Sequence, residues 1–142
     1  MKIDINLKKT RPDAKIPFHA TEGSAGCDLC AAEETLILPG ETKKIPTGIA
    51  IEIPEGYFMK MEGRSGLSAK GIVKTGGVID SDYRGEIHIV LYNSTNQEFK
   101  IEKGDRVAQG IIIPIMQARF NEVRELSETI RGDKGFQSTG IK

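Results

Sequence analysis

The segment that organises this chain reads Gly77-Val78-Ile79-Asp80-Ser81-Asp82-Tyr83-Arg84-Gly85-Glu86-Ile87. It combines the backbone chemistry of a β-hairpin with a dense group of polar side chains, and its glycines allow a turn or a close approach to a ligand. In an extended segment Asp80 and Asp82 point to the same face, so one of these acids could face a pocket. An ordinary hairpin, in which Asp and Gly satisfy the turn geometry, is the alternative for this segment alone.

Short β-type runs lie on both sides of this segment, and turn residues such as Pro39-Gly40 and Pro54-Glu55-Gly56 separate them. Their rhythm predicts an all-β sandwich or barrel. Residues 120–130 could form a last strand or a short helix. The predicted strands are Lys2 to Leu7, Cys27 to Ala32, Leu36 to Leu38, Thr42 to Ile45, Gly48 to Ile53, Tyr57 to Met61, Glu86 to Asn93, Phe99 to Ile101 and Arg106 to Ile115.

One short helix is predicted in the stretch Gly63-Arg64-Ser65-Gly66-Leu67-Ser68-Ala69-Lys70-Gly71. Ser65 is a candidate N-cap, and Gly71 ends the run of helix-forming residues. The helix start would present free backbone N–H groups together with Arg64 and the Ser65 hydroxyl, which is a suitable cradle for phosphate. The bracketing glycines favour anion binding over the alternative, a capped helical turn with a solvated arginine.

The length of 142 residues fits one domain, and the 20 basic and 20 acidic side chains cancel to a formal charge of zero. Without a large cationic face, we expect no DNA or RNA partner, and any phosphate ligand should be small and locally bound. No apolar run approaches the length of a membrane span, and the N-terminus does not read as a signal peptide. We therefore expect a cytoplasmic protein with no membrane partner.

The two cysteines, Cys27 and Cys30, have the spacing of a redox motif or of half a zinc site. Their neighbours read as a strand, in which residues three apart project to opposite faces and do not readily share a metal or a disulfide. The chain has no second cysteine pair, and its two histidines, His19 and His88, lie elsewhere. We expect reduced, structural thiols.

Three further features allow a functional and a structural interpretation. Asp28 follows small residues, so other groups could approach it closely, although a solvent-facing strand aspartate is the alternative. Gln109 interrupts the apolar run of residues 106–115, which we expect to be buried on both faces, one of them against another subunit. Residues 131–140 have the composition of a flexible end, yet they could also order over a ligand.

Five segments occur in order along nearly the whole chain: Ala25-Gly26-Cys27-Asp28-Leu29, Gly63-Arg64-Ser65-Gly66-Leu67, the stretch from Gly77 to Gly85, Gly104-Asp105-Arg106-Val107-Ala108-Gln109, and Arg131-Gly132 with Gly135-Phe136-Gln137-Ser138-Thr139-Gly140. In this order they resemble the five motifs of the homotrimeric dUTPases, the deoxyuridine triphosphate nucleotidohydrolases. One such motif is a weak signal, whereas five in register are specific.

The resemblance implies an all-β fold, a distorted jelly-roll-like β-barrel with one short helix, assembled as a trimer with active sites shared between subunits. Residues 1–130 would form the β domain, and residues 131–142 a flexible C-terminal lid that closes over a neighbouring subunit's site. The implied reaction is Mg²⁺-assisted hydrolysis of dUTP to dUMP and pyrophosphate, which keeps dUTP low and supplies dUMP for thymidylate synthesis.

The resemblance also implies roles for the residues of the central segment. Asp80 matches the family's catalytic acid, which would orient and deprotonate a water for attack at the α-phosphorus and hold the sugar 3′-OH. Tyr83 would lie against the deoxyribose and reject ribonucleotides. Backbone groups of Gly77, Val78 and Ile79 would read the edge of uracil and leave no room for a 5-methyl group.

Other matching positions would hold the triphosphate. The phosphate-binding residues would be Arg64, Ser65 and Gly66, while Gln109 and Asp28 match residues that contact the phosphate chain and the waters of the metal. Asp28 would act on the metal indirectly, through water, because Mg²⁺ commonly keeps several waters and takes other oxygens from nucleotide phosphates.

In the lid, Arg131, Ser138 and Thr139 would bind the γ-phosphate, and Phe136 would stack on uracil. Gln137, another substrate-binding position by this resemblance, stands where the family usually has Gly, so lid closure is the step that this departure would affect.

Lys74 is a further departure from the family's pattern, and two rival functions share the same motifs. Lys74 stands about where many members carry an Asn near the base, and His88 could edge the pocket or be structural. The related dCTP deaminases place a Glu near the base, for which Glu86 is the candidate here. A trimeric module that binds a deoxynucleotide without turnover, or a purely structural trimer, is the non-catalytic alternative.

Overall fold

The computed structural model describes residues 2–135, and this part of the chain is nearly all β with one short helix, as the sequence predicts. The strands are β1 (Asn6–Lys9), β2 (Cys27–Cys30), β3 (Thr35–Ile37), β4 (Thr42–Pro46), β5 (Ile49–Glu52), β6 (Tyr57–Glu62), β7 (Ile72–Thr75), β8 (Val78–Ile79), β9 (His88–Asn93), β10 (Phe99–Ile101) and β11 (Arg106–Pro114). The helix α1 (Ser65–Ser68) lies between β6 and β7. Among the described residues, no helix is long and apolar enough to cross a membrane.

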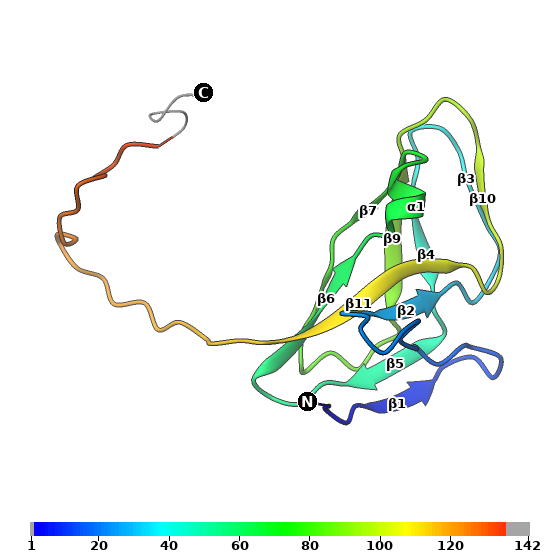
Figure 1. Cartoon of the computed structure of the whole chain (residues 1–142), viewed down its shortest axis with the longest axis horizontal. Helices are drawn as coiled ribbons and strands as arrows, with labels where there is room; N and C mark the ends of the chain where they lie inside the picture. Colours follow the sequence, from blue (N-terminus) through cyan, green and yellow to red (C-terminus); the bar gives the residue numbers. More distant parts are fainter. Residues whose placement is uncertain (1, 136–142) are drawn as a thin grey trace.

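The strands form four antiparallel sheets rather than one continuous sheet. A four-stranded sheet has the order β2-β11-β6-β8, and a three-stranded sheet has the order β4-β9-β7. Strands β1 and β5 form one pair, and β10 and β3 form another. Figure 1 shows β11 running diagonally across the β body beside β2, and this sheet carries four of the predicted site residues, Asp28, Gln109, Val78 and Ile79.

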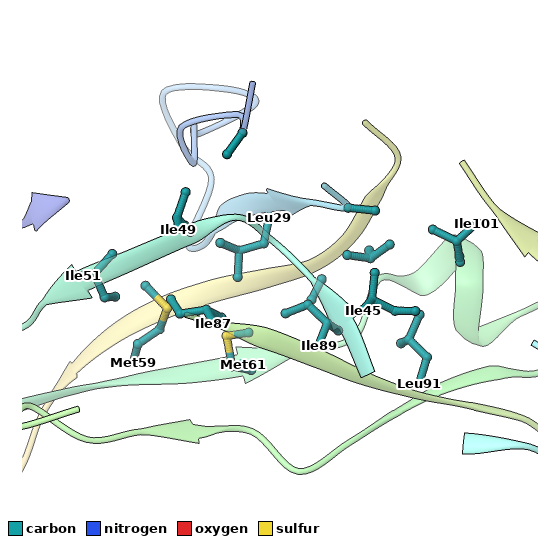
Figure 2. Packing of buried hydrophobic residues seen from close by; sticks show 14 of the residues in the cluster. Leu29, Ile45, Ile49, Ile51, Met59, Met61, Ile87, Ile89, Leu91 and Ile101 are labelled. Carbon is teal, nitrogen blue, oxygen red and sulfur yellow. The ribbon is translucent and has the colours of Figure 1, made fainter. Parts of the chain in front are cut away.

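One hydrophobic core holds these sheets together, and isoleucine dominates it. Its most deeply buried side chains, which are almost completely removed from water, include Leu29 on β2 and Ile37, Ile45, Ile87 and Ile101. Figure 2 shows side chains from β4, β5, β6 and β9 converging on the same interior. Because β-branched side chains pack well on a pleated surface, this composition favours short strands over helices.

The ends of several elements differ from the sequence prediction. The first strand is Asn6–Lys9 and pairs with β5, so the predicted start at Lys2 is wrong. Ser65 is the first helical residue and not the N-cap; the N-cap is Arg64, whose side chain makes no capping hydrogen bond. The helix is shorter than predicted, because it ends at Ser68 with Ala69 as its C-cap; Gly71, with a φ of 79°, belongs to the turn that follows.

The central segment turns as predicted, but its two flanking strands do not pair with each other. The Tyr83 N–H donates to the Asp80 carbonyl at 3.2 Å, which closes the turn. Strand β8 pairs with β6, whereas β9 pairs with β4 and β7 in a different sheet. The expected hairpin is therefore a connection between two sheets, because hydrogen bonding to other strands satisfies each side of the turn.

After β11 the chain leaves the β body, and Figure 1 shows it running away as an extended segment. Residues 115–135, which we call the arm, contain neither strand nor helix, so both predictions for residues 120–130 are wrong. Several large apolar side chains of the arm are almost fully exposed within the single chain, including Met116, Phe120 and Leu126.

Both cysteines are free, as predicted. Cys27 is half-buried and its Sγ donates to the Gly110 carbonyl at 3.4 Å, while Cys30 is buried. Burial raises the pKa of both thiols, which keeps them protonated and unreactive at neutral pH.

Candidate active site

Asp28 is the centre of a charged cluster on the four-stranded sheet. The residue is only 8% exposed, and its carboxylate pairs with two guanidinium groups. Arg106 Nη1 lies 3.1 Å from Asp28 Oδ2, and Arg64 Nε lies 3.4 Å from Asp28 Oδ1. The alternative of a solvent-facing aspartate is therefore wrong, because a carboxylate removed from water requires such partners.

Gln109 lies directly opposite Asp28 in the pairing of β11 with β2. Its Nε2 donates to the Gly63 carbonyl at 3.4 Å, just before the arginine of the second motif. A Cβ on Gly26 would lie 3.0 Å from Gln109 Oε1, so this amide packs against bare backbone. Residues of the first, second and fourth motifs thus meet, and we call Asp28, Arg64, Arg106 and Gln109 the Asp28 cluster.

A cleft of about 410 Å³ opens beside this cluster. Its lining includes three cationic side chains, Arg64, Lys70 and Arg106, against one carboxylate, Asp105, together with the apolar Phe99 and Ile101. The backbone N–H groups at the start of α1 face no acceptor within the helix, as at any helix N-terminus. Ser65 and Gly66 supply these amides next to Arg64, so the arrangement suits an anion such as a phosphate.

Sequence reasoning missed Arg106 as a site residue. It belongs to the fourth motif, and its guanidinium makes the shorter of the two ion pairs with Asp28. Its carbonyl also accepts from Arg64 Nη1 at 3.4 Å, which links the two arginines. The signal was the register of β11 against β2, which places Arg106 beside Cys30 and Gln109 beside Asp28, and a single sequence does not reveal that register.

Asp80 and Tyr83 lie on the exposed turn that follows β8. The Tyr83 hydroxyl donates to the Glu86 carbonyl at 2.8 Å, which fixes the ring across the turn. A Cβ on Gly85 would lie 2.5 Å from that hydroxyl oxygen, so the ring occupies the space that the glycine leaves. Val78 is 63% exposed although it is apolar, so the predicted base-reading strand is open to a ligand.

The single chain does not bring Asp80 to the Asp28 cluster. Gln109 pairs with Asp28 on one side and with Glu62 on the other, whereas the residue before Asp80 pairs with Met59. Three residues along β6 correspond to about 10 Å, and the three strand spacings from β8 to β2 to about 14 Å. The two offsets are perpendicular, so Asp80 is at least on the order of 17 Å from Asp28 within one chain.

Arg131 lies on the exposed arm, where its Nε donates to the Lys134 carbonyl at 2.9 Å. It does not contact the other predicted site residues in the described chain. Phe136, Gln137, Ser138 and Thr139 lie outside the described residues.

Within residues 2–135 no group of three or more His, Cys, Asp or Glu side chains is placed to hold a metal ion. Asp28, the residue predicted to act on a metal through water, already pairs with two arginines. Such a donor set fits a divalent ion that keeps its waters and takes oxygens from bound phosphates, and not an ion caged by protein ligands.

Glu86 is engaged in a structural network. Its Oε1 accepts from the Gly48 N–H at 2.7 Å and lies 3.4 Å from Arg11 Nε. His88 contacts the same residue, with Nδ1 3.1 Å from the Glu86 carbonyl and Nε2 3.7 Å from the carboxylate. These contacts tie Glu86 to Gly48, just before β5, and to Arg11 of the N-terminal segment, which does not favour its use as the base of a deaminase.

Comparison with known proteins identifies the family of this chain. A family model described as dUTPase matches residues 12–140. The chain is 48% identical over 139 residues to the deoxyuridine 5′-triphosphate nucleotidohydrolase of Nautilia profundicola, covering 96% of this chain and 98% of the relative. It is 47% identical over 140 residues to the protein of the same name from Hydrogenobaculum, with coverage of 96% and 97%.

Solved structures give the same result for the fold. The dUTPase of Staphylococcus bacteriophage 80alpha with dUpNHpp has a TM-score of 0.92 and 30% identity, with coverage of 99% of this chain and 100% of that chain. A point mutant of the dUTPase from phage phi11 of S. aureus, described with a structural Mg(II) ion, has a TM-score of 0.84 and 26% identity, with coverage of 89% and 100%. The family model and the curated relatives span nearly the whole sequence, and the chain therefore belongs to the dUTPase family.

Proposed function

We propose that this protein hydrolyses dUTP to dUMP and pyrophosphate, at sites that more than one chain builds. The observation that carries the proposal is the Asp28 cluster beside a cationic cleft, together with the separate turn that presents Asp80. Family membership and the names of the curated relatives support dUTP as substrate. So does the dUTP analogue in the phage 80alpha structure.

In the proposed mechanism, Asp80 orients a water and accepts its proton as the water attacks the α-phosphorus. Pyrophosphate is the leaving group, and its negative charge is met by Arg64 and the first amides of α1. Gln109 donates to the phosphate chain from its position opposite Asp28. Catalysis thus depends on positioning and on fixed positive charge, because phosphoryl transfer requires little covalent participation from the protein.

Base and sugar selection belong to the other end of the site. The backbone of Gly77, Val78 and Ile79 would pair with uracil, while the Tyr83 ring packs against the deoxyribose. In the free protein the Tyr83 hydroxyl is held by the Glu86 carbonyl, so the ring is ordered before a nucleotide binds. A fixed ring leaves no space for a 2′-OH, and this would exclude ribonucleotides.

Mg²⁺ fits this site as an ion carried by the nucleotide. When bound, it would neutralise charge on the triphosphate and help to fix the conformation of the phosphate chain. Asp28 would contact its waters, because the two arginines occupy the carboxylate only in part. The structural neighbour described with Mg(II) supports a requirement for a divalent metal.

The separation of Asp80 from the Asp28 cluster supports a site assembled between chains. A nucleotide that contacts both would bridge two copies, with Asp80 from one and the Asp28 cluster from the other. The family resemblance implies that the copies form a trimer of jelly-roll-like β domains. The exposed arm would then carry residues 131–142 to a neighbouring site as a lid.

The direct test is pyrophosphate release from dUTP, dCTP, dTTP and UTP, measured in parallel with Mg²⁺ and with EDTA. Chromatography identifies the product bases. The proposal predicts Mg²⁺-dependent release from dUTP alone, with dUMP as the second product. Deamination of dCTP would assign the protein to the rival enzyme class, and a protein that turns over none of the four would be a binding or structural module.

A further inference from the structure

Lys74 makes contacts that the proposed chemistry does not use. It lies on β7, is half-buried, and its Nζ donates to two backbone carbonyls, those of Met61 and Gly76, each at 2.7 Å. The described residues offer it no carboxylate within ion-pair distance. An ammonium group has three N–H donors, and Lys74 uses two of them in hydrogen bonds to these carbonyls.

The contacts of Lys74 lie at the short connection between two sheets. Strand β7 belongs to the three-stranded sheet and β8 to the four-stranded sheet, and only Gly76 and Gly77 separate them. Both backbone groups of Met61 on β6 are engaged here, because its N–H donates to the Gly77 carbonyl at 2.7 Å and its carbonyl accepts from Lys74.

The two glycines give this connection unusual backbone freedom. Gly76 has a φ of 69° and Gly77 a φ of 144°, conformations that residues with a side chain rarely adopt. A Cβ on Gly77 would lie 2.7 Å from Lys74 Nζ and 3.0 Å from the Met61 carbonyl oxygen, so the ammonium fills the space above the glycine. Glycine has the largest backbone freedom of any residue, and an external contact must therefore restrict it.

The same side chain lies close to the start of the second motif. A Cβ on Gly63 would lie 3.5 Å from the Lys74 Cβ, and the Gly63 carbonyl accepts from Gln109. Lys74 therefore lies between the backbone that precedes Arg64 and the backbone that leads into Val78.

We propose that Lys74 is a positioning residue, which clamps the Gly76–Gly77 connection so that the backbone of residues 77–80 is set to receive the base before a nucleotide arrives. This inference rests on the proposed function. Without the clamp, only part of the population would hold the binding conformation, and the apparent affinity would fall by that fraction. The chemical step at saturation would change little, since Lys74 does not touch the reacting atoms.

The test compares Lys74→Met, which keeps the length of the stem and removes the donors, with Lys74→Arg, which keeps donors and charge. Lys44→Met is the matched control, because Lys44 is exposed on β4 of the same sheet as β7. For each protein we would measure KM and kcat for dUTP, the Kd of dUMP by calorimetry, and hydrogen exchange of a peptide covering residues 75–80 without ligand.

For Lys74→Met we expect KM and Kd to rise together by about tenfold, kcat to stay within about threefold, and exchange at residues 76–79 to accelerate. Lys74→Arg should recover most of the affinity, and Lys44→Met should resemble the wild type. If Lys74→Met does not fold, Lys74→Gln, which keeps an uncharged donor, should show the same effects in weaker form.

A Kd for dUMP within about twofold of the wild type, or unchanged exchange at residues 76–79, would overturn the inference while leaving dUTP hydrolysis in place. A wild-type protein that neither binds dUMP nor hydrolyses dUTP would instead overturn the proposed function. In that case the exchange comparison would still decide whether Lys74 clamps the connection.

Discussion

Asp28 and Asp80 are two carboxylates of one proposed site, yet the structure holds them in opposite ways. Asp28 is buried and pairs with Arg64 and Arg106, whereas Asp80 lies exposed on a turn. A buried carboxylate contributes to folding through its partners, while an exposed one is free to act on a ligand. Stability and turnover should therefore separate at these two positions.

We expect Asp28→Ala to lower the free energy of unfolding by about 1–3 kcal/mol, because two guanidiniums lose their partner. The loss stays moderate since the side chains of Arg64 and Arg106 are 32% and 44% exposed and can turn to water. Asp80→Asn should change stability by less than about 0.5 kcal/mol, yet reduce kcat by about 10²–10⁴. Urea unfolding and dUTP turnover measure both, and equal destabilisation by the two variants would contradict this assignment.

Gly85 tests how Tyr83 is positioned. In Gly85→Ala the new Cβ would lie 2.5 Å from the Tyr83 hydroxyl oxygen, so the ring must leave the Glu86 carbonyl. We expect discrimination between dUTP and UTP to fall by about tenfold, measured as the ratio of kcat/KM values. Gly23→Ala is the control, since nothing lies within 4 Å of its Cβ position. Unchanged selectivity in Gly85→Ala would show that this ring does not exclude the 2′-OH.

Among the elements, local pattern predicted most strands but missed β7 (Ile72–Thr75), and it predicted the strand pairing poorly. Alternating and β-branched runs identified β4, β5, β6 and β9 to within about two residues, because side-chain burial on a strand has a local period. The partner of β8 is β6 and not β9, and this depends on contacts far apart in sequence. For the same reason the sequence does not predict the ion pair of Arg106 with Asp28, whereas Asp28, Arg64 and Gln109 were identified as site residues from motifs.

The contact of β11 with β6 gives a prediction at this scale. A Cβ on Gly110 would lie 2.6 Å from the Sδ of the buried Met59. We expect Gly110→Ala to destabilise the protein by about 1–3 kcal/mol through overpacking. In the double variant with Met59→Ala, the loss should be smaller than the sum of the single losses by about 1 kcal/mol. Strictly additive losses in urea unfolding would exclude this contact as the cause.

At the scale of the whole molecule, the exposed arm is the feature that a single chain does not explain. Phe120 is 93% exposed and Leu126 is 87% exposed, on a segment without regular structure. Large apolar side chains at this density indicate a surface that another molecule covers. A segment that packs on another chain carries apolar residues at intervals, as an amphipathic strand or helix does. For this reason the composition of residues 120–130 suggests a strand or a helix.

If the arm packs on a second copy, trypsin should cut after Arg119 and Arg124 slowly in concentrated protein and faster after dilution below the dissociation constant of the assembly. Mass spectrometry of the fragments follows both sites over time. Cleavage within the β body, for example after Lys44, provides the internal comparison. Rapid cleavage of the arm that is independent of protein concentration would show that no second copy covers it.

A site shared between chains is the central feature of the proposed mechanism, and mixing two inactive variants tests it directly. Asp80→Asn and Arg64→Ala remove opposite ends of the site, and each homo-oligomer should hydrolyse dUTP slowly. After the two are co-refolded in equal amounts, about half of the chains carry an intact Asp80 and about half an intact Arg64. A site that takes these residues from two different chains therefore has both intact in about a quarter of cases. We predict recovery of about a quarter of wild-type turnover. No recovery in mixed oligomers would mean that each chain carries a complete site of its own.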